Sequence, residues 1–150
     1  MGKAKDISCS LAQPGEAAIV GDLATQLSSL PCGFAEIWVH IGDFPALMAL
    51  VNDRQGWLMY LRYDGDAGFS SRNPGYRGDP EATISYLLSN GQLDHTPAAW
   101  SYPLQVVVDA VLHFARSGRV PDDIAWSNDS GDGIASPNDD AVGCVGPPDP

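Results

Sequence analysis

The sequence predicts an α+β fold in which an antiparallel β-meander of about six or seven strands carries two helices packed on one face. Three observations lead to this prediction. Apolar residues recur at helical spacing in two segments, one in each half of the chain. Between these segments lie short apolar or alternating stretches, separated by turn sequences such as Asn-Gly. The chain has 150 residues and is 44% apolar, which suffices for one packed core.

A single domain is expected over residues 14–127. Residues 1–13 show no clear periodicity, and we interpret them as a loose N-terminal arm. Residues 128–150 are dominated by Gly, Pro, Asp and Ser, so we expect a mobile acidic tail that packs against nothing. The chain lacks both an apolar run long enough for a membrane span and the apolar core of a secretory signal, which favours a cytoplasmic protein.

The first helix is predicted over residues 16–30. Pro14 and Gly15 mark its start, and Pro31 stops it. One side of this helix is expected to face the sheet, because apolar residues recur there at helical spacing. These residues are Ile19, Val20, Leu23, Leu27 and Leu30.

The predicted strands begin with "FAEIWVHI" at residues 34–41. Its alternation places Ala35, Ile37, Val39 and Ile41 on one face, and Phe34, Glu36, Trp38 and His40 on the other. "ALMALV" and "WLMYLRY" flank the polar turn "NDRQG" and predict a hairpin. Further strands are predicted in "FSS", "EATISYLLS" and "QLDHT", with an Asn-Gly hairpin turn between the last two.

The second helix follows Pro97, where the apolar spacing becomes helical. Ser101 or Tyr102 is expected to cap its start, Pro103 to occupy its first turn and Gly118 to end it. After this helix, "DIAW" predicts a short closing strand. The apolar stripe of the helix consists of Leu104, Val107, Val108, Val111, Leu112 and Ala115.

The charge of the chain is strongly negative. Nineteen acidic and eight basic residues give a net charge of −11. All eight basic residues lie at or before Arg119, and the seven aspartates that follow give residues 120–150 a charge of −7. Such a chain repels nucleic acid, whose binding requires a basic surface, and attracts a basic protein partner. Solubility alone also accounts for an acidic surface, so both interpretations stay open here.

No motif of catalytic chemistry is visible. His40, His95 and His113 stand apart, and the chain contains neither HExxH nor the HxE and PCxxC pair of zinc deaminases. It also lacks a GxSxG elbow and a phosphate-binding loop. The three cysteines form no CxxC pair and are interpreted as reduced thiols. We therefore expect a protein that is not an enzyme and that holds no cofactor and no metal.

One acidic stretch, "NDSGDGIASPND" at residues 128–139, has oxygen-bearing side chains at the spacing of an EF-hand calcium loop. It departs from that motif at both ends, where Asn128 and Asp139 replace an Asp and a bidentate Glu. The residues after it cannot form the exit helix of an EF-hand. A solvated acidic segment is therefore favoured over a calcium site.

The stretch "VVVDAVLHFARSGRVPDDIAW" combines a helix with Phe114 near its end, a Gly-Arg-x-Pro link and a closing Trp126. It resembles the C-terminal signature of a family of bacterial immunity proteins from polymorphic toxin systems, the first Imm family to be catalogued. The resemblance extends to "WLMYLRYDGDAGFSSRNPGYRGDP" and "ATISYLLSNGQ", and covers residues 34–126. Phe114 and Trp126 are interpreted as packing residues.

The resemblance implies an immunity protein that binds one cognate toxin as a 1:1 complex. Toxins paired with this family usually belong to the deaminase superfamily, which implies a cytidine deaminase as partner, and neither nucleic acid nor membrane is an expected ligand. An acidic inhibitor suits the basic substrate channel of such an enzyme. Contacts are expected in turns and loops, because these are exposed. The candidates are the aromatic Tyr63, Phe69 and Tyr76 and the acidic Asp64, Asp66, Asp79, Glu81, Asp122 and Asp123.

Two other function classes stay open. A non-catalytic adaptor or regulatory domain with a partner other than a toxin also needs only a binding face. A domain that binds a small molecule would contain an apolar pocket and would melt at a higher temperature with its ligand bound.

Overall fold

The structure, a computed structural model, describes residues 4–30 and 32–139. Its long helices are α1 (Ala17–Ser28) and α2 (Leu104–Ser117), and η1 (Ala98–Trp100) is a short 3-10 turn. The predicted α+β fold class is confirmed. The strands are β1 (Lys5–Leu11), β2 (Phe34–Ile41), β3 (Ala46–Asn52), β4 (Gln55–Leu61), β5 (Phe69–Arg72), β6 (Thr83–Leu87), β7 (Leu93–Pro97), β8 (Tyr102–Pro103) and β9 (Ala125–Asn128).

The main sheet has the strand order β1-β2-β3-β4-β5-β9, and the short β8 pairs with β4. Neighbouring strands are antiparallel except β1 and β2, which run parallel and are connected through α1. A helix is the usual connection between parallel neighbours, since a tight turn can join only antiparallel strands. The strand predicted at residues 34–41 is confirmed at both ends as β2.

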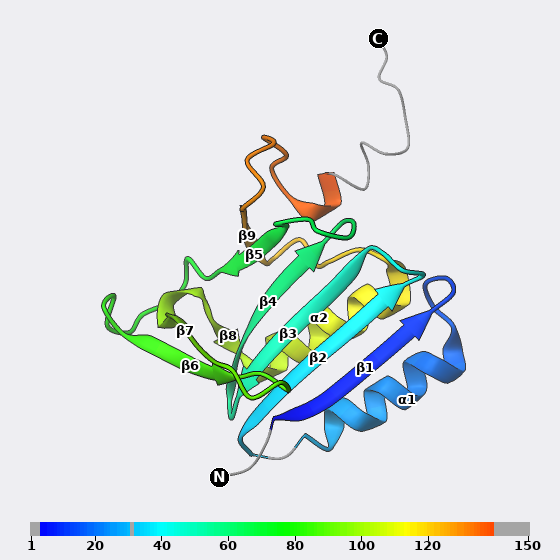
Figure 1. The fold of residues 1–150 in the computed structure, drawn as a ribbon, viewed down its shortest axis with the longest axis horizontal. Coiled ribbons are helices and arrows are strands. Elements are labelled where there is room, and N and C mark those ends of the chain that lie inside the picture. The colour runs from blue at the N-terminus through cyan, green and yellow to red at the C-terminus, as the bar shows by residue number, and fades with distance from the viewer. Residues whose placement is uncertain (1–3, 31, 140–150) are drawn as a thin grey trace.

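Both helices cover the same face of the main sheet, as predicted (Figure 1). Gly56 in β4 allows α2 to approach closely, because a Cβ at this position would lie 2.9 Å from Val107 Cγ2. No helix in the described part of the chain is long and apolar enough to cross a membrane. The largest side chains buried between helices and sheet include Ile7, Leu11, Leu23, Ile37, Leu47, Leu58, Phe69 and Phe114.

Strands β6 and β7 form a separate hairpin and do not continue the main sheet. This hairpin lies on the sheet face opposite the helices, where β6 contacts β2 and β3 (Figure 1). Tyr86 of β6 is fully buried there together with Met48 and Leu50 of β3. The expectation of one continuous meander is therefore wrong for β6 and β7, because their apolar side packs onto the sheet face instead of joining the sheet edge.

The end of α2 is the one that the sequence predicts. Gly118 adopts the left-handed conformation, with φ 76°, and its N–H donates to the Phe114 carbonyl at 2.7 Å. Glycine adopts this conformation without the steric cost that a Cβ imposes. The helix therefore ends at a residue suited to stop it.

The start of α2 differs from the prediction. Pro103 is the N-cap, without a side-chain cap, so the predicted cap by Ser101 or Tyr102 is wrong. Tyr102 lies instead in β8, next to β4. The free N–H of Leu104 donates to the Arg54 carbonyl at 2.7 Å, so the β3–β4 turn satisfies it in place of a capping side chain.

The prediction of a loose N-terminal arm is wrong for residues 5–11, which form β1. Ile7 and Leu11 are each only 1% exposed. The strand pairs with β2 along its whole length. An edge strand needs only one apolar face. In this segment polar residues alternate with the apolar ones, so the apolar face was not recognised from the sequence.

The prediction of a tail that packs against nothing is wrong for residues 128–139, since Asn128 ends β9 and residues 129–139 are attached by side-chain bonds. The Asn138 side-chain amide donates to the Val120 carbonyl at 2.7 Å and accepts from the Val120 N–H at 3.1 Å. Asp132 forms an ion pair with Arg62. These bonds attach the stretch to the link after α2 and to the end of β4, while residues 140–150, also assigned to the tail, lie outside the described part of the chain.

Candidate functional site

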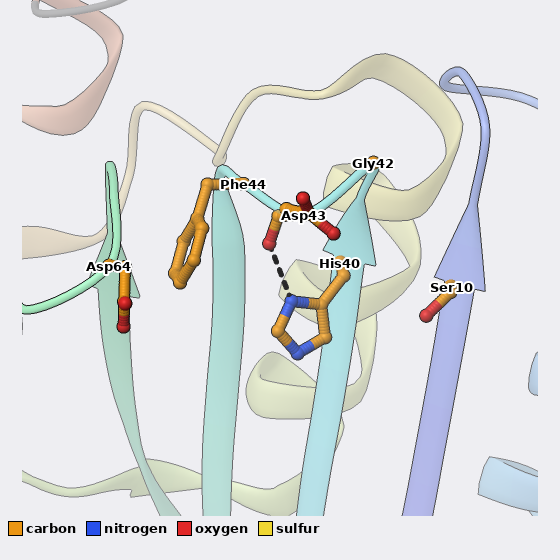
Figure 2. Close-up of a pocket in the computed structure, with 6 residues that line it drawn as sticks. All are labelled: Ser10, His40, Gly42, Asp43, Phe44 and Asp64. Carbon is orange, nitrogen blue, oxygen red and sulfur yellow. Dashed lines mark hydrogen bonds between the residues drawn. The ribbon is translucent and has the colours of Figure 1, made fainter.

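The face of the main sheet opposite the helices is called the outer face here, and the β6–β7 hairpin covers only part of it. A hollow of about 460 Å³ lies on this face at one end of the sheet. Its residues come from β1, from β2 and from the β2–β3 and β4–β5 turns (Figure 2). They are Ser10, His40, Gly42, Asp43, Phe44 and Asp64, and they define the outer-face hollow.

Three aromatic rings form a stripe along this face into the hollow. The rings of Trp38 and His40 stack with centroids 5.6 Å apart and planes inclined by 13°. Phe44 meets His40 edge-on at a centroid distance of 5.8 Å. All three side chains are half-buried, so each ring is held by its neighbours while part of it stays accessible.

Glu36 connects the aromatic stripe to the hairpin. Its carboxylate accepts the Trp38 indole N–H at 2.6 Å and the backbone N–H and hydroxyl of Ser89 at 2.7 and 2.9 Å. Burial raises the pKa of Glu36, but the bonds from Ser89 and Trp38 outweigh burial, and the pKa lies below its ordinary value. The ionised carboxylate therefore holds Trp38 and the β6–β7 turn in one arrangement.

The polar groups around the hollow are mostly hydrogen-bond acceptors. His40 Nδ1 lies 2.8 Å from the Asp43 carbonyl oxygen (Figure 2). A carbonyl only accepts, so we infer that Nδ1 carries the hydrogen and that Nε2 of the neutral ring accepts. Within the described residues, neither Nε2 nor the carboxylates of Asp43 and Asp64 have a hydrogen-bond partner.

Four of the residues proposed from the sequence lie in the β4–β5 turn or directly after it, and only two of them are exposed. Tyr63 is 54% exposed, and Asp64 lines the outer-face hollow. Asp66 is 9% exposed and Phe69 is fully buried, so the expectation that the turn exposes them is wrong. Phe69 already belongs to β5 and packs in the core, and Asp66 faces inward toward Arg62.

Three more proposed residues lie in the loop between β5 and β6. Asp79 and Glu81 are exposed and Tyr76 is half-buried. The Tyr76 hydroxyl donates to the Asp79 carbonyl at 3.0 Å, and the Asp79 carboxylate accepts the Glu81 N–H at 2.8 Å. These bonds shape the loop itself. The loop lies away from the β4–β5 turn, at the other end of β5 (Figure 1).

The last two proposed residues, Asp122 and Asp123, follow α2 and are exposed. Asp122 accepts a hydrogen bond from the Asn138 side chain at 3.0 Å. The nine proposed residues therefore do not form one surface, and Asp64 is the one among them that lines the outer-face hollow.

Sequence reasoning missed the other residues of the hollow and of the stripe. The alternation in "FAEIWVHI" does place Trp38 and His40 on one face of a strand. It does not show whether that face is covered, since this depends on where the hairpin packs. Asp43 and Phe44 lie in the turn directly after β2, and the ring of Phe44 contacts the ring of His40, which is close in the sequence. This short separation is the local signal that could have indicated a cluster.

Two further hollows have different linings. One of about 570 Å³ lies between the helices and is lined mainly by apolar side chains of α1 and α2. Another of about 340 Å³ includes Arg54, Arg77 and Tyr76. Among the described residues, no group of three His, Cys, Asp or Glu side chains could hold a metal ion. In the EF-hand-like stretch, Asp132 instead accepts bonds from Arg62, Asn128 and the Ile134 N–H.

The fold and this surface define a class of protein: an α+β domain with one main sheet, two long helices behind it and an aromatic and acidic outer face. The particular family follows from comparison with known families, because the family model for immunity protein Imm1 matches residues 12–128. The chain therefore belongs to the Imm1 family of immunity proteins. No curated protein matches the chain.

The matched region runs from the residue after β1 to the end of β9. It includes the second helix, the Gly-Arg-x-Pro link and the closing strand. The family that the sequence resembles is therefore confirmed. The partner of an immunity protein is a cognate toxin, and a binding surface is accordingly the feature to seek in this structure.

Proposed function

We propose that the chain neutralises a toxin that deaminates cytidine in nucleic acid, by occupying the active site or substrate channel of that enzyme. The observation that carries the proposal is the Imm1 match over residues 12–128. The charge of −11 supports a deaminase as the toxin, because an enzyme that binds nucleic acid has a basic channel. Neutralisation requires a complementary surface on this chain and no catalysis by it.

The outer-face hollow and its rim are the proposed centre of the contact. The aromatic stripe supplies rings of the kind that anchor protein interfaces, and the exposed Tyr63 lies in the turn that contributes Asp64. The acids that lie elsewhere, Asp79, Glu81, Asp122 and Asp123, are proposed to attract the toxin over longer distances. Asp66 and Phe69 are proposed to support the turn from within.

The test is co-expression of this chain with the toxin domain encoded beside it. A stable 1:1 complex is expected on size exclusion with light scattering. The isolated toxin domain is expected to deaminate cytidine in single-stranded DNA or RNA, and one equivalent of this chain is expected to abolish that activity.

The outcomes separate the parts of the proposal. If no complex forms, immunity against this toxin is wrong. If a complex forms but the toxin deaminates neither DNA, RNA nor free cytidine, the deaminase assignment is wrong and immunity stands. If the complex forms and deamination continues at its full rate, blockade of the active site is wrong.

A further inference from the structure

We propose that the outer-face hollow binds an arginine side chain of the toxin, with its guanidinium against the Phe44 ring, between the Asp64 carboxylate and the side of the hollow formed by His40 and Asp43. This inference rests on the proposed function, because the arginine belongs to the toxin. It goes further, because it names the chemical group that the surface recognises and the residues that recognise it.

The first argument is the hydrogen-bonding character of the lining. Asp43 and Asp64 contribute only acceptors when ionised, and the remaining ring nitrogen of His40 is also an acceptor. The Ser10 hydroxyl can accept as well as donate. A ligand that satisfies these groups must be rich in donors. The arginine side chain has five N–H donors and no acceptor.

The second argument is charge. Among the described residues, two carboxylates and no lysine or arginine side chain line the hollow. Asp66, which lies in the β4–β5 turn with Asp64, shows how a carboxylate can be paired within this chain. Asp66 receives two side-chain hydrogen bonds from Arg62, at 2.7 and 2.9 Å, while Asp64 has no hydrogen-bond or ion-pair partner among the described residues. A cation that pairs with Asp64 and Asp43 is therefore expected to come from the partner.

The third argument distinguishes arginine from lysine. The ring of Phe44 lies between the Asp64 side chain and the His40 ring (Figure 2). A planar guanidinium can stack on an aromatic ring and donate in its own plane to acceptors on either side, whereas an ammonium acts as a point charge. The volume of about 460 Å³ falls within the size range of ligand sites, so it admits an arginine side chain with its stem.

The first experiment tests the hollow without the toxin. The ¹⁵N-labelled chain is titrated with N-acetyl-arginine amide, and with the uncharged N-acetyl-citrulline amide as a control. Saturable amide shifts are expected at residues 40–44 and at Asp64 with the arginine compound alone. The variant Asp43→Asn with Asp64→Asn is expected to bind it about tenfold more weakly or not at all. The matched variant Asp79→Asn with Glu81→Gln, which removes the same charge from another loop, is expected to bind like the original chain.

The second experiment uses the toxin domain. The Asp43→Asn, Asp64→Asn variant is expected to dissociate from the toxin about tenfold faster or more, since partner groups lose their hydrogen bonds. Phe44→Leu is expected to weaken binding while keeping the charge. Circular dichroism and urea unfolding check that each variant is folded.

The inference is overturned if citrulline shifts the same amides as arginine, if the shifts do not saturate, or if both double variants bind the toxin equally well. If the toxin binds the original chain and both double variants alike, immunity survives and this contact fails. If no toxin binds but the arginine compound saturates the hollow, the proposed function fails and the arginine site stands. If N-acetyl-lysine amide bound more tightly than N-acetyl-arginine amide, the hollow would recognise positive charge in general, and the stacking argument for arginine would be overturned.

Discussion

Asp66 is the most strongly hydrogen-bonded carboxylate of the β4–β5 turn. It accepts from Arg62 Nε and Nη2 at 2.7 and 2.9 Å and from the N–H groups of Arg62 and Gly68, each at 3.0 Å. The Asp66 side chain is fully buried and that of Arg62 is 6% exposed. The hydrogen bonds from Arg62 are the main cause that lowers the pKa of Asp66 to about 2, against the effect of burial.

Replacing this residue is therefore expected to destabilise the fold. Asp66→Ala removes the two side-chain hydrogen bonds that the buried Arg62 guanidinium makes to Asp66, while the ion pair with Asp132 stays. We expect a loss of about 1–3 kcal/mol in the free energy of unfolding, measured with urea at pH 7. Asp64→Ala is the control, because Asp64 is exposed two residues away and should change stability by about 0.5 kcal/mol or less. Equal losses in the two variants would contradict the assignment of the ion pair.

The same pair makes a prediction about pH. The folded-state pKa of Asp66 lies below the value of about 3.9 expected in the unfolded chain, so the ionised carboxylate stabilises the fold at neutral pH. This contribution is expected to fade as the pH falls from about 4 toward about 2. Urea unfolding at pH 3 and pH 7 should therefore show a smaller difference between the original chain and Asp66→Ala at the lower pH.

Residues of the candidate site illustrate what local sequence can and cannot indicate. A turn was predicted around Asp64, and Asp64 does line the hollow. The same reasoning treated Asp66 and Phe69 as exposed, although one is paired with Arg62 and the other begins a buried strand. Whether a turn residue is exposed depends on contacts with residues distant in the sequence, such as Asp132, which forms an ion pair with Arg62. A local sequence pattern does not show such contacts.

At the scale of elements, strand β1 shows why pairing is harder to predict than periodicity. Ile7, Cys9 and Leu11 do alternate along the segment. Only three positions carry the pattern, and the partner strand lies beyond an intervening helix. By contrast, α1 and β2 were predicted close to their observed limits, because each carries its own complete apolar pattern. Local patterns predict elements, while parallel pairing and the separate hairpin depend on contacts between them.

The burial of β1 leads to a test of its importance. Ile7 is 1% exposed and belongs to the main core, so Ile7→Ala is expected to cost about 2–5 kcal/mol in the free energy of unfolding. Ser8→Ala is the matched control, since Ser8 is the next residue of the same strand and is exposed. If Ile7→Ala unfolds at the same urea concentration as the original chain, β1 adds nothing to the core and the N-terminal segment behaves as the loose arm first expected.

At the scale of the whole molecule, the negative charge and the outer-face hollow are expected to act on different steps of binding. The charge of −11 is spread over many turns, and long-range attraction depends on this total more than on any one residue. The contacts that resist dissociation depend instead on the few groups that touch the partner. Association and dissociation rates should therefore respond differently to the same loss of charge.

This difference can be measured with the two neutralising variants and the toxin domain. Asp79→Asn with Glu81→Gln and Asp43→Asn with Asp64→Asn remove equal charge, so both are expected to slow association by a similar factor at low salt. Both effects should shrink at an ionic strength of about 0.15 M, where charges more than about 8 Å apart are screened. Only the outer-face variant is expected to accelerate dissociation, and this effect should persist in salt because it arises from direct contacts. If the loop variant also accelerated dissociation, the β5–β6 loop would itself contact the toxin, and the interface would extend from the hollow across the hairpin.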